Sequence, residues 1–158
     1  MTDCKSKYLL FILPVLLVFG SFLLFFGLKD SEKITSAPGP SVRINNTVAS
    51  VELADEASEQ WQGLSDRESL GEQDGMLFVF PDMQKRTFVM RRMHFPLDII
   101  WIRDNKIVGI AKNLAPEGEN PKEFYSSPER VNYVLEVNGG FCDKQGIEVG
   151  DVVEINNQ

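Results

Sequence analysis

The residues best suited to chemistry gather in one stretch, residues 88–101, where charged side chains lie among apolar ones. Asp98 is flanked by Leu97 and Ile99, and strand alternation puts its side chain on the same face as Ile100. If that face belongs to the core, the carboxylate needs a cation or backbone N–H donors, because an unpaired buried charge is costly. The stretch therefore predicts a polar cluster around Asp98 in apolar surroundings.

Two arginines, Arg91 and Arg92, precede a bend expected at Pro96 and are the nearest candidate partners for Asp98. In a structural interpretation, Asp98 pairs with one of them or caps a turn, since buried ion pairs occur without any functional role. In a functional interpretation, Met90, Arg91, Arg92 and Asp98 bind a ligand at the mouth of a pocket, and an arginine holds an anionic group of that ligand.

A second acid, Glu136, alternates with Leu135 and Val137 and faces water in the simplest interpretation. Paired with Asp98 at about 5–9 Å, it would instead form an acid–base couple of the glycosidase type. The sequence contains no nucleophile elbow, phosphate loop or dinucleotide fingerprint. It therefore favours a protein that is not an enzyme, with a hydrolase using Asp98 and Glu136 as the alternative.

Neither a metal site nor a cofactor is predicted. His94 is the only histidine and has no clustered Cys or Asp neighbours, so it is a surface residue or a lone general base. Cys142 lies in a short helical pattern and is interpreted as a small buried hydrophobe, with a thiol nucleophile as the alternative. Residues 146–151 have the composition of a tight turn, in which Asp151 bonds to nearby backbone N–H groups.

An uncharged run of 21 residues, residues 8–28, precedes these motifs. About 20 apolar residues in a helix span the hydrocarbon core of a bilayer, and Lys5 and Lys7 favour a cytoplasmic N-terminus. The sequence thus predicts a short cytoplasmic segment, residues 1–7, and a single-pass signal anchor with the rest of the chain extracytoplasmic. A cleaved signal peptide is the alternative, although its apolar region is usually only about 7–15 residues long.

The remaining chain divides into a polar tether, residues 29–46, and a globular domain, residues 47–156. One helix is expected from Asp55 to Gly63, with an apolar stripe of Ala57, Trp61 and Leu64, and a second, short one over residues 140–145. The long loop at residues 115–128 is expected to line a site. The fold class is α+β and mostly β, a small open barrel of about seven short strands. The expected strands cover residues 47–53, 75–80, 86–90, 97–103, 107–110, 131–137 and 151–155.

Charge and cysteine content limit the partners. Four of the 16 Lys+Arg and three of the 23 Asp+Glu precede residue 42, which leaves 12 cations, 20 acids and a net charge of −8 in the rest. An acidic surface repels phosphate backbones, so nucleic acid is not an expected partner. Cys4 and Cys142 would lie on opposite sides of the membrane and cannot pair. The expected partners are the lipid bilayer, through residues 8–28, and a small anionic ligand, a glycan or an envelope protein.

Several motifs resemble the family of the domain of unknown function DUF192, over about residues 48–155. The resemblance implies a compact β-rich domain, often behind a signal or anchor, and no established reaction. The chain has Val89 where the family commonly has Trp, and Ser65 where it commonly has Met. The motifs are Gly63-Leu64-Ser65-Asp66-Arg67, Gly75-Met76-Leu77-Phe78-Val79-Phe80, the block from Phe88 to Asp98, Val134-Leu135-Glu136 and Val149-Gly150-Asp151.

Taken together, these features predict a membrane-anchored, extracytoplasmic module that binds a ligand or a protein without catalysis. Its site would comprise the bend at residues 90–98 and the loop at residues 115–128. One alternative is an envelope hydrolase that uses Asp98 and Glu136. The other is a structural or assembly factor of the envelope with a contiguous exposed apolar patch, which the exposure of Phe95, Trp101 and Phe124 would distinguish.

Overall fold

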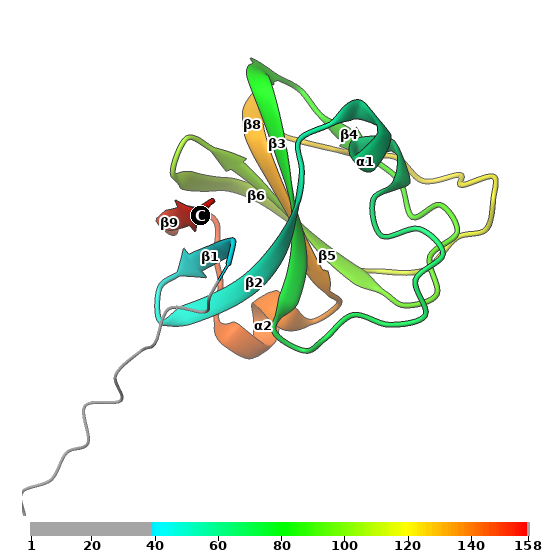
Figure 1. Ribbon diagram of the computed structural model, residues 1–158, viewed down its shortest axis with the longest axis horizontal. Helices are drawn as coiled ribbons and strands as arrows, with labels where there is room; N and C mark the ends of the chain where they lie inside the picture. Colours follow the sequence, from blue (N-terminus) through cyan, green and yellow to red (C-terminus); the bar gives the residue numbers. More distant parts are fainter. Residues whose placement is uncertain (1–38, 158) are drawn as a thin grey trace, which may run out of the picture. The chain divides into compact units, whose positions relative to one another are not determined.

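The computed structural model describes residues 39–157, and within this range the chain forms nine strands and two short helices (Figure 1). Among these residues, neither helix is both long and apolar enough to cross a bilayer. The predicted anchor, residues 8–28, and the first part of the predicted tether lie outside the described residues.

Seven strands form one sheet in the order β6-β5-β8-β3-β2-β1-β9, and β4 and β7 form a separate two-stranded sheet. All neighbouring strands of the large sheet are antiparallel except β2 and β3, which are parallel and joined by α1. The elements are β1 Ser41–Ile44, β2 Thr47–Ala54, α1 Ala57–Gln62, β3 Asp74–Gln84, β4 Thr87–Phe88, β5 Leu97–Arg103, β6 Lys106–Leu114, β7 Tyr125–Ser126, β8 Val131–Asn138, α2 Phe141–Gln145 and β9 Val153–Asn156.

The large sheet curls until its two edge strands meet at one end (Figure 1). Lys106 at the start of β6 bridges to Val152 just before β9, and the N–H of Ile107 donates to the carbonyl of Asp151 at 3.0 Å. This contact satisfies edge groups that would otherwise be open to pairing with another chain. The expected α+β, mostly β, open barrel of about seven strands is therefore confirmed as a curled half-barrel with two short helices.

Both faces of the sheet are covered by apolar side chains. On one face, Ile100, Ile102, Leu135 and Val137 pack in a cluster that includes Phe141 of α2. On the other face, a second cluster joins the sheet to the segment between α1 and β5; it includes Leu64, Phe78, Met90, Met93, Ile99 and Trp101. Burial on both sides explains why β5 is apolar from Leu97 to Ile102 apart from Asp98.

The domain starts earlier than expected, because β1 lies within the segment interpreted as tether. Val42 and Ile44 are buried, and β1 pairs with β2 on one side and with β9 on the other. The prediction of a tether up to residue 46 is therefore wrong for residues 41–46. Four residues next to a Pro-Gly-Pro segment carry little local strand signal, and their strand conformation depends on partners that are distant in sequence.

Helix α1 also differs from the expectation. Its N-cap is Glu56 rather than Asp55, and the side chain of Glu59 accepts the backbone N–H groups of both residues at 3.2 Å. No residue of α1 is buried, so the predicted apolar stripe fails at Ala57 and Trp61. The helix is held instead by Gln60, whose side-chain amide donates to the carbonyls of β2 and β3.

Two strand boundaries were predicted wrongly. Strand β3 continues past Pro81, which is tolerated because the pairing of β3 with β8 is irregular between Val79 and Gln84. The strand expected over residues 86–90 is reduced to Thr87–Phe88, because its partner β7 is itself only two residues long.

Candidate functional site

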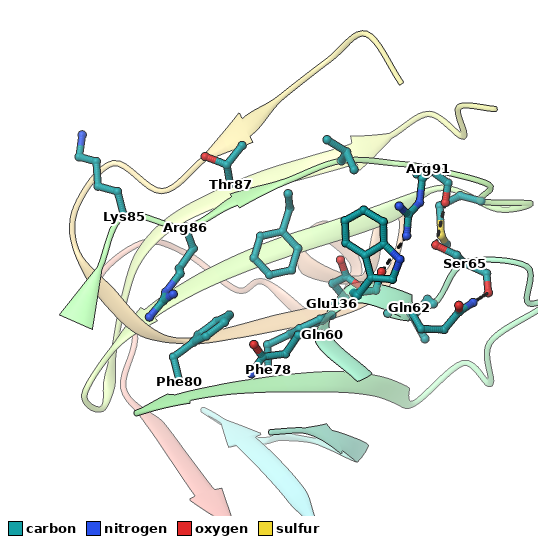
Figure 2. A pocket seen from close by; sticks show the side chains of 16 residues that line it. Gln60, Gln62, Ser65, Phe78, Phe80, Lys85, Arg86, Thr87, Arg91 and Glu136 are labelled. Atoms are coloured by element: carbon teal, nitrogen blue, oxygen red, sulfur yellow. Dashed lines mark hydrogen bonds between the residues drawn. The ribbon is translucent and has the colours of Figure 1, made fainter. Parts of the chain in front are cut away.

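A cleft of about 470 Å³ opens between α1 with its following turn, β3 and the segment at residues 85–93 (Figure 2). Its size is within the usual range of small-ligand sites. Aromatic, cationic and amide side chains line it together with one carboxyl group. The lining residues are Gln60, Trp61, Gln62, Gly63, Leu64, Ser65, Phe78, Phe80, Lys85, Arg86, Thr87, Phe88, Val89, Arg91, Met93 and Glu136.

Glu136 is the carboxyl group of the cleft. In the sheet register, it lies between Met76 of β3 and Ile99 of β5, so its side chain emerges on the face covered by the second apolar cluster. The residue is only 5% exposed, and among residues 39–157 its side chain has neither a hydrogen bond nor an ion pair. Burial raises the pKa of Glu136 to about 8. In the empty cleft at neutral pH, this carboxyl group is therefore mostly protonated.

Gly63 allows the chain to pass close to this carboxyl group. It ends α1 with φ +51°, and a Cβ placed on it would lie 3.4 Å from the Phe78 ring and 4.0 Å from Oε2 of Glu136. A side chain here would be strained by the backbone conformation and would also fill space beside Glu136. Glycine thus keeps this part of the cleft open.

Aromatic rings and guanidinium groups form the walls. The rings of Phe78 and Phe88 meet edge to face, with centroids 4.9 Å apart. The guanidinium of Arg91 lies 4.1 Å from the Trp61 ring centroid, and that of Arg86 lies 3.9 Å from the Phe80 ring centroid. These contacts hold each guanidinium against a ring by cation–π attraction.

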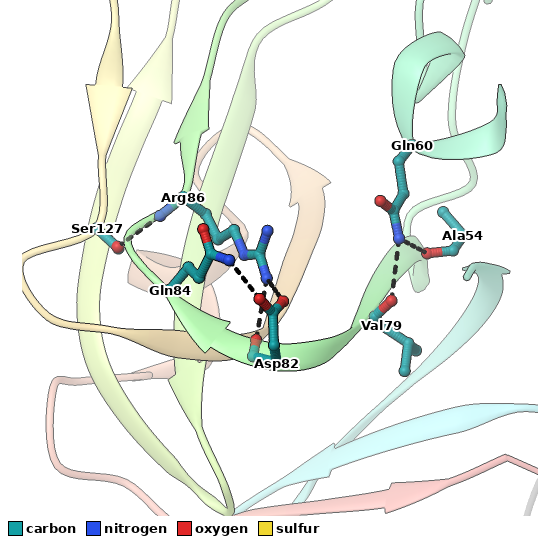
Figure 3. Close-up of polar contacts among 7 residues, drawn as sticks. All are labelled: Ala54, Gln60, Val79, Asp82, Gln84, Arg86 and Ser127. Carbon is teal, nitrogen blue, oxygen red and sulfur yellow. Dashed lines mark hydrogen bonds and ion pairs between the residues drawn. The ribbon is translucent and has the colours of Figure 1, made fainter. Parts of the chain in front are cut away.

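Arg91 and Arg86 differ in whether their charge is neutralised. Figure 3 shows Arg86 on the side chain of Asp82, which also accepts from Gln84. Arg91 donates to the carbonyl of Trp61 at 2.8 Å and, within the described part of the chain, has no carboxylate partner. Arg91 therefore brings an uncompensated positive charge to the rim of the cleft.

The walls of the cleft are fixed to the sheet and to each other. Gln60 donates to the carbonyls of Ala54 and Val79 at 3.2 and 3.0 Å (Figure 3). The hydroxyl of Ser65 donates to the carbonyl of Arg91 at 2.9 Å, which joins the turn after α1 to the opposite wall (Figure 2). Such contacts keep a binding site pre-organised.

Asp98 has a structural role in this arrangement. It is fully buried, and its carboxylate accepts the backbone N–H groups of Asn113, Gly140 and Cys142 at 2.7, 3.0 and 2.8 Å. It thereby caps the start of α2 and ties that helix to β6. The prediction that Asp98 caps a turn is confirmed, whereas the predicted pairing with an arginine is wrong.

Of the other residues expected to bind a ligand, Arg91 alone lines the cleft. Met90 is fully buried in the core, and Arg92 pairs with Asp66 at 2.9 Å outside the lining. The loop at residues 115–128 does not line the cleft either; Glu117 donates its N–H to the carbonyl of Met90 and so supports the wall from behind. Pro96 is itself outside the lining, and its carbonyl accepts the N–H of Gly139 at 2.8 Å.

The remaining candidates for chemistry are not part of the cleft. Cys142 is buried on the opposite face of the sheet, and burial raises the pKa of its thiol, with Asp98 adding to the effect. It is therefore the inert hydrophobe that the sequence suggested. His94 is exposed and outside the cleft lining. Among the described residues, no three His, Cys, Asp or Glu side chains are grouped to hold a metal ion.

Sequence reasoning missed most of the cleft. Trp61 was assigned to a buried stripe, yet it is 72% exposed, and Glu136 was expected to face water, yet it is buried. One sequence feature could have indicated the cleft: Gly63, a turn residue that directly follows a helix carrying an aromatic side chain. This feature indicates a site only if the turn is known to fold over β8.

Residues 41–155 match the model of the family DUF192, whose description is "Uncharacterized ACR". A crystal structure of a protein of unknown function from Novosphingobium aromaticivorans is 36% identical with a TM-score of 0.67, covering 72% of this chain and 83% of that one. A Sinorhizobium meliloti protein, provisionally described as a transcription regulator, is 30% identical with a TM-score of 0.68, covering 78% and 99%. No similar chain is found among proteins with curated functions.

Proposed function

Because the chain belongs to the DUF192 family, whose description names no activity, we propose from the cleft itself that the domain is a non-catalytic module that binds a small ligand with an anionic group. The ligand occupies the cleft over Glu136, and its anionic group pairs with Arg91 at the rim. This proposal moves the predicted site from the bend at residues 90–98 to the cleft between α1 and residues 85–93.

The observation that carries the proposal is the unpartnered carboxyl group of Glu136. Polar side chains in protein interiors usually have a hydrogen-bond partner within the protein, whereas the carboxyl oxygens of Glu136 reach the cleft and no group of the described chain bonds to them. Here the group is retained next to an open cleft rather than in a sealed core. A ligand that bonds to Glu136 would supply the hydrogen bond or ion pair that the described chain does not provide.

The rim supports an anionic ligand. Lys85, Arg86 and Arg91 all line the cleft, although the described part of the chain is otherwise acidic. Arg91 has no carboxylate partner in the described chain. One of its terminal nitrogens donates to the carbonyl of Trp61 and its Nε is buried, so its other terminal nitrogen remains as a charged donor for an anionic group.

Binding is favoured over hydrolysis by the positions of the two acids. The carboxylate-pair mechanism needs both groups on one substrate, about 5–9 Å apart. Asp98 lies on the face of α2 with all its bonds satisfied, and Glu136 lies on the cleft face. The sheet therefore separates them, and Glu136 acts in the cleft as a hydrogen-bonding group.

The exposure of Phe95, Trp101 and Phe124 gives less support to a role as an assembly factor, which would need a contiguous exposed apolar patch. Trp101 is buried and Phe95 is partly buried, whereas Phe124 is exposed. Of these three residues, Phe124 alone is exposed, and hydrophobic residues exposed singly are normal on a protein surface.

We further propose that residues 8–28 anchor the domain in the cell membrane with the cleft on the extracytoplasmic side. The support is the length of the uncharged run and the two lysines before it. Since β1 starts at Ser41, residues 29–40 would be the tether, with an extended reach of about 40 Å.

The test of ligand binding uses the full chain in a non-ionic detergent and two probes of one shape. These are 3,3-dimethylbutanoate, an anion, and 3,3-dimethylbutan-1-ol, its uncharged counterpart, with binding measured by calorimetry. We expect the anion to bind at least about tenfold more tightly, and Arg91→Met to remove the difference. Arg130→Met, at an exposed arginine outside the cleft, is the matched control and should leave both affinities unchanged. Equal binding of the two probes, or no binding of either, would contradict the proposed function.

A further inference from the structure

Two unpaired groups of opposite charge type share this cleft, a buried carboxyl group and a rim guanidinium. We infer that the natural ligand is a small zwitterion, with an ammonium group against Glu136 and an anionic group on Arg91. This inference rests on the proposed function and deepens it, because it names the second charge of the ligand and the residue that recognises it.

The protein supplies no cation to Glu136. Its neighbours on β3 and β5 are Met76 and Ile99, and the turn above it contributes Gly63. The charged groups that line the cleft are Lys85, Arg86 and Arg91, and none of them forms an ion pair with Glu136. The acid therefore lacks a counterion on every side that the described chain covers.

A carboxyl group in this position holds a proton when the cleft is empty, since burial alone raises its pKa to about 8. An ammonium group entering the cleft would supply the missing positive charge. The proton of Glu136 then passes to the solvent, and the carboxylate that remains pairs with the ligand. One proton is released for each zwitterion bound, so charge is balanced without any other reactant.

The walls favour the same kind of group. Aromatic faces attract ammonium and quaternary ammonium ions, with the greatest effect where water is excluded. Phe78 and Phe88 lie in edge-to-face contact beside the cleft, and Trp61 and Phe80 already each hold a guanidinium. Phe78, Glu136 and Arg91 all line the cleft (Figure 2).

The opposite arrangement is a ligand that is only an anion. It would leave Glu136 protonated, as a donor to a neutral or anionic acceptor. Such a ligand would release no proton and would gain nothing from a positive charge in its apolar part. The two arrangements are therefore distinguished by adding that charge without changing the shape of the ligand.

Four small molecules of nearly one shape provide this comparison. Glycine betaine carries both charges, 3,3-dimethylbutanoate only the negative one, choline only the positive one, and 3,3-dimethylbutan-1-ol neither. Each is titrated by calorimetry into the full chain in a non-ionic detergent at pH 8. The glycine betaine titration is repeated at pH 7 in phosphate and in Tris, whose different ionisation enthalpies reveal the number of protons released.

We expect glycine betaine to bind at least about tenfold more tightly than 3,3-dimethylbutanoate. Choline should bind more tightly than 3,3-dimethylbutan-1-ol by a similar factor. At pH 7 close to one proton should be released for each glycine betaine bound. As the pH rises towards 7, the dissociation constant for glycine betaine should decrease about tenfold per pH unit, because the ionised fraction of Glu136 increases. Above about pH 8 the dissociation constant should become constant.

The variant Glu136→Gln keeps the shape of the side chain and removes its charge. It should bind glycine betaine and 3,3-dimethylbutanoate within about twofold of each other, at all pH values. Glu148→Gln, at an exposed acid outside the cleft, is the control and should behave as the unaltered chain. The proton count is made on the unaltered chain, so it decides the matter even if Glu136→Gln does not fold.

The outcomes separate this inference from the proposed function. If 3,3-dimethylbutanoate binds as tightly as glycine betaine, or no proton is released, the zwitterion inference is overturned while the anion-binding function stands. If Glu136→Gln retains the preference for glycine betaine, the ammonium group lies elsewhere and the inference is also overturned. If none of the four molecules binds, both the inference and the proposed function fail.

Discussion

Asp98 and Glu136 lie on adjacent strands, yet their side chains project from opposite faces of the sheet. Asp98 is directly opposite Val137 in the β5–β8 register, and Glu136 is directly opposite Ile99. One acid is thereby placed where backbone N–H groups of α2 and β6 surround it, and the other where nothing in the described chain bonds to it. An acidic side chain thus has a structural role on one face and a candidate binding role on the other.

The structural role of Asp98 can be tested by removing its carboxylate. Asp98→Ala leaves three backbone N–H groups without an acceptor, and bonds to charged groups contribute about 1.5–3 kcal/mol each. We expect the free energy of unfolding in urea to fall by about 3 kcal/mol or more. Asp55→Ala, at an exposed acid that is not the N-cap of α1, should change it by less than about 0.5 kcal/mol. A similar loss in both variants would count against the capping role.

Glu136 should make the stability of the protein depend on pH in a direction unusual for a carboxylate. Its pKa is about 8 in the folded chain and near 4.5 when unfolded, so between these values the folded state binds the extra proton. The free energy of unfolding should therefore fall by about 1.4 kcal/mol for each pH unit from roughly pH 5 to pH 8 through this group.

The difference between the unaltered chain and Glu136→Gln isolates this effect, because all other groups titrate in both. Urea unfolding at several pH values should show the two chains closest near pH 4.5 and the variant increasingly the more stable towards pH 8. Glu148→Gln should follow the unaltered chain throughout. Parallel curves for Glu136→Gln and the unaltered chain would mean that Glu136 is not a buried, unpaired acid.

Trp61 is expected to matter for binding and little for folding. It is 72% exposed, and its main contact is the guanidinium of Arg91, a cation–π pair that contributes about 0.5–1 kcal/mol at exposed sites. Trp61→Ala should lower the free energy of unfolding by no more than about 1 kcal/mol, while weakening the binding of 3,3-dimethylbutanoate at least about fivefold. Phe124→Ala, at a residue that is 69% exposed outside the cleft, should leave the affinity unchanged. Equal effects of the two variants would indicate nonspecific apolar contact.

The parts of the fold that could be predicted are those with local signals. The apolar runs expected as strands over residues 97–103 and 107–110 are β5 and the first part of β6, and the two strands pair through a tight turn in which Asp104 has a positive φ. The short helix predicted over residues 140–145 is α2, and Gly146 ends it in a left-handed conformation. By contrast, β1 and the parallel pairing of β2 with β3 depend on contacts between distant segments, for which four or five residues carry no distinct pattern.

The candidate site was harder to predict for the same physical reason. Alternation along β8 correctly places the side chain of Glu136 on the opposite face of the sheet from those of Leu135 and Val137. It does not show whether other parts of the chain cover the face that carries Glu136. That depends on the turn at residues 63–65, which folds over β8 after α1. A polar residue on the second face of a strand was therefore interpreted as solvated, although the cover makes it buried.

The glycine in this turn provides a test of the cleft's shape. Gly63→Ala would force a side chain into φ +51°, and the added methyl group would contact the Phe78 ring and approach Glu136. We expect the free energy of unfolding to fall by about 1–2 kcal/mol. The binding of 3,3-dimethylbutanoate should weaken at least about fivefold, which is the factor expected for Trp61→Ala. Gly118→Ala, at a glycine where a Cβ would have no neighbour within 4 Å, is the control for both measurements. Unchanged affinity in Gly63→Ala would place the ligand away from Glu136.

The proposed membrane topology can be tested by labelling cysteines at three positions, because one of the three is too deeply buried to react. Cys142 is fully buried with a thiol pKa raised by burial, so it should not react with a maleimide in the folded chain. Glu148→Cys places a thiol on an exposed turn of the domain, and Cys4 precedes the apolar run. In intact cells, a membrane-impermeant maleimide should label the introduced cysteine at position 148 and leave Cys4 unlabelled until the cells are lysed.

Labelling of position 148 only after lysis would place the domain in the cytosol, and a soluble protein that has lost Cys4 would mean that the apolar run is cleaved. Retention of the label in the membrane after an alkaline wash is expected if residues 8–28 span the bilayer, since about 20 apolar residues are held there against extraction.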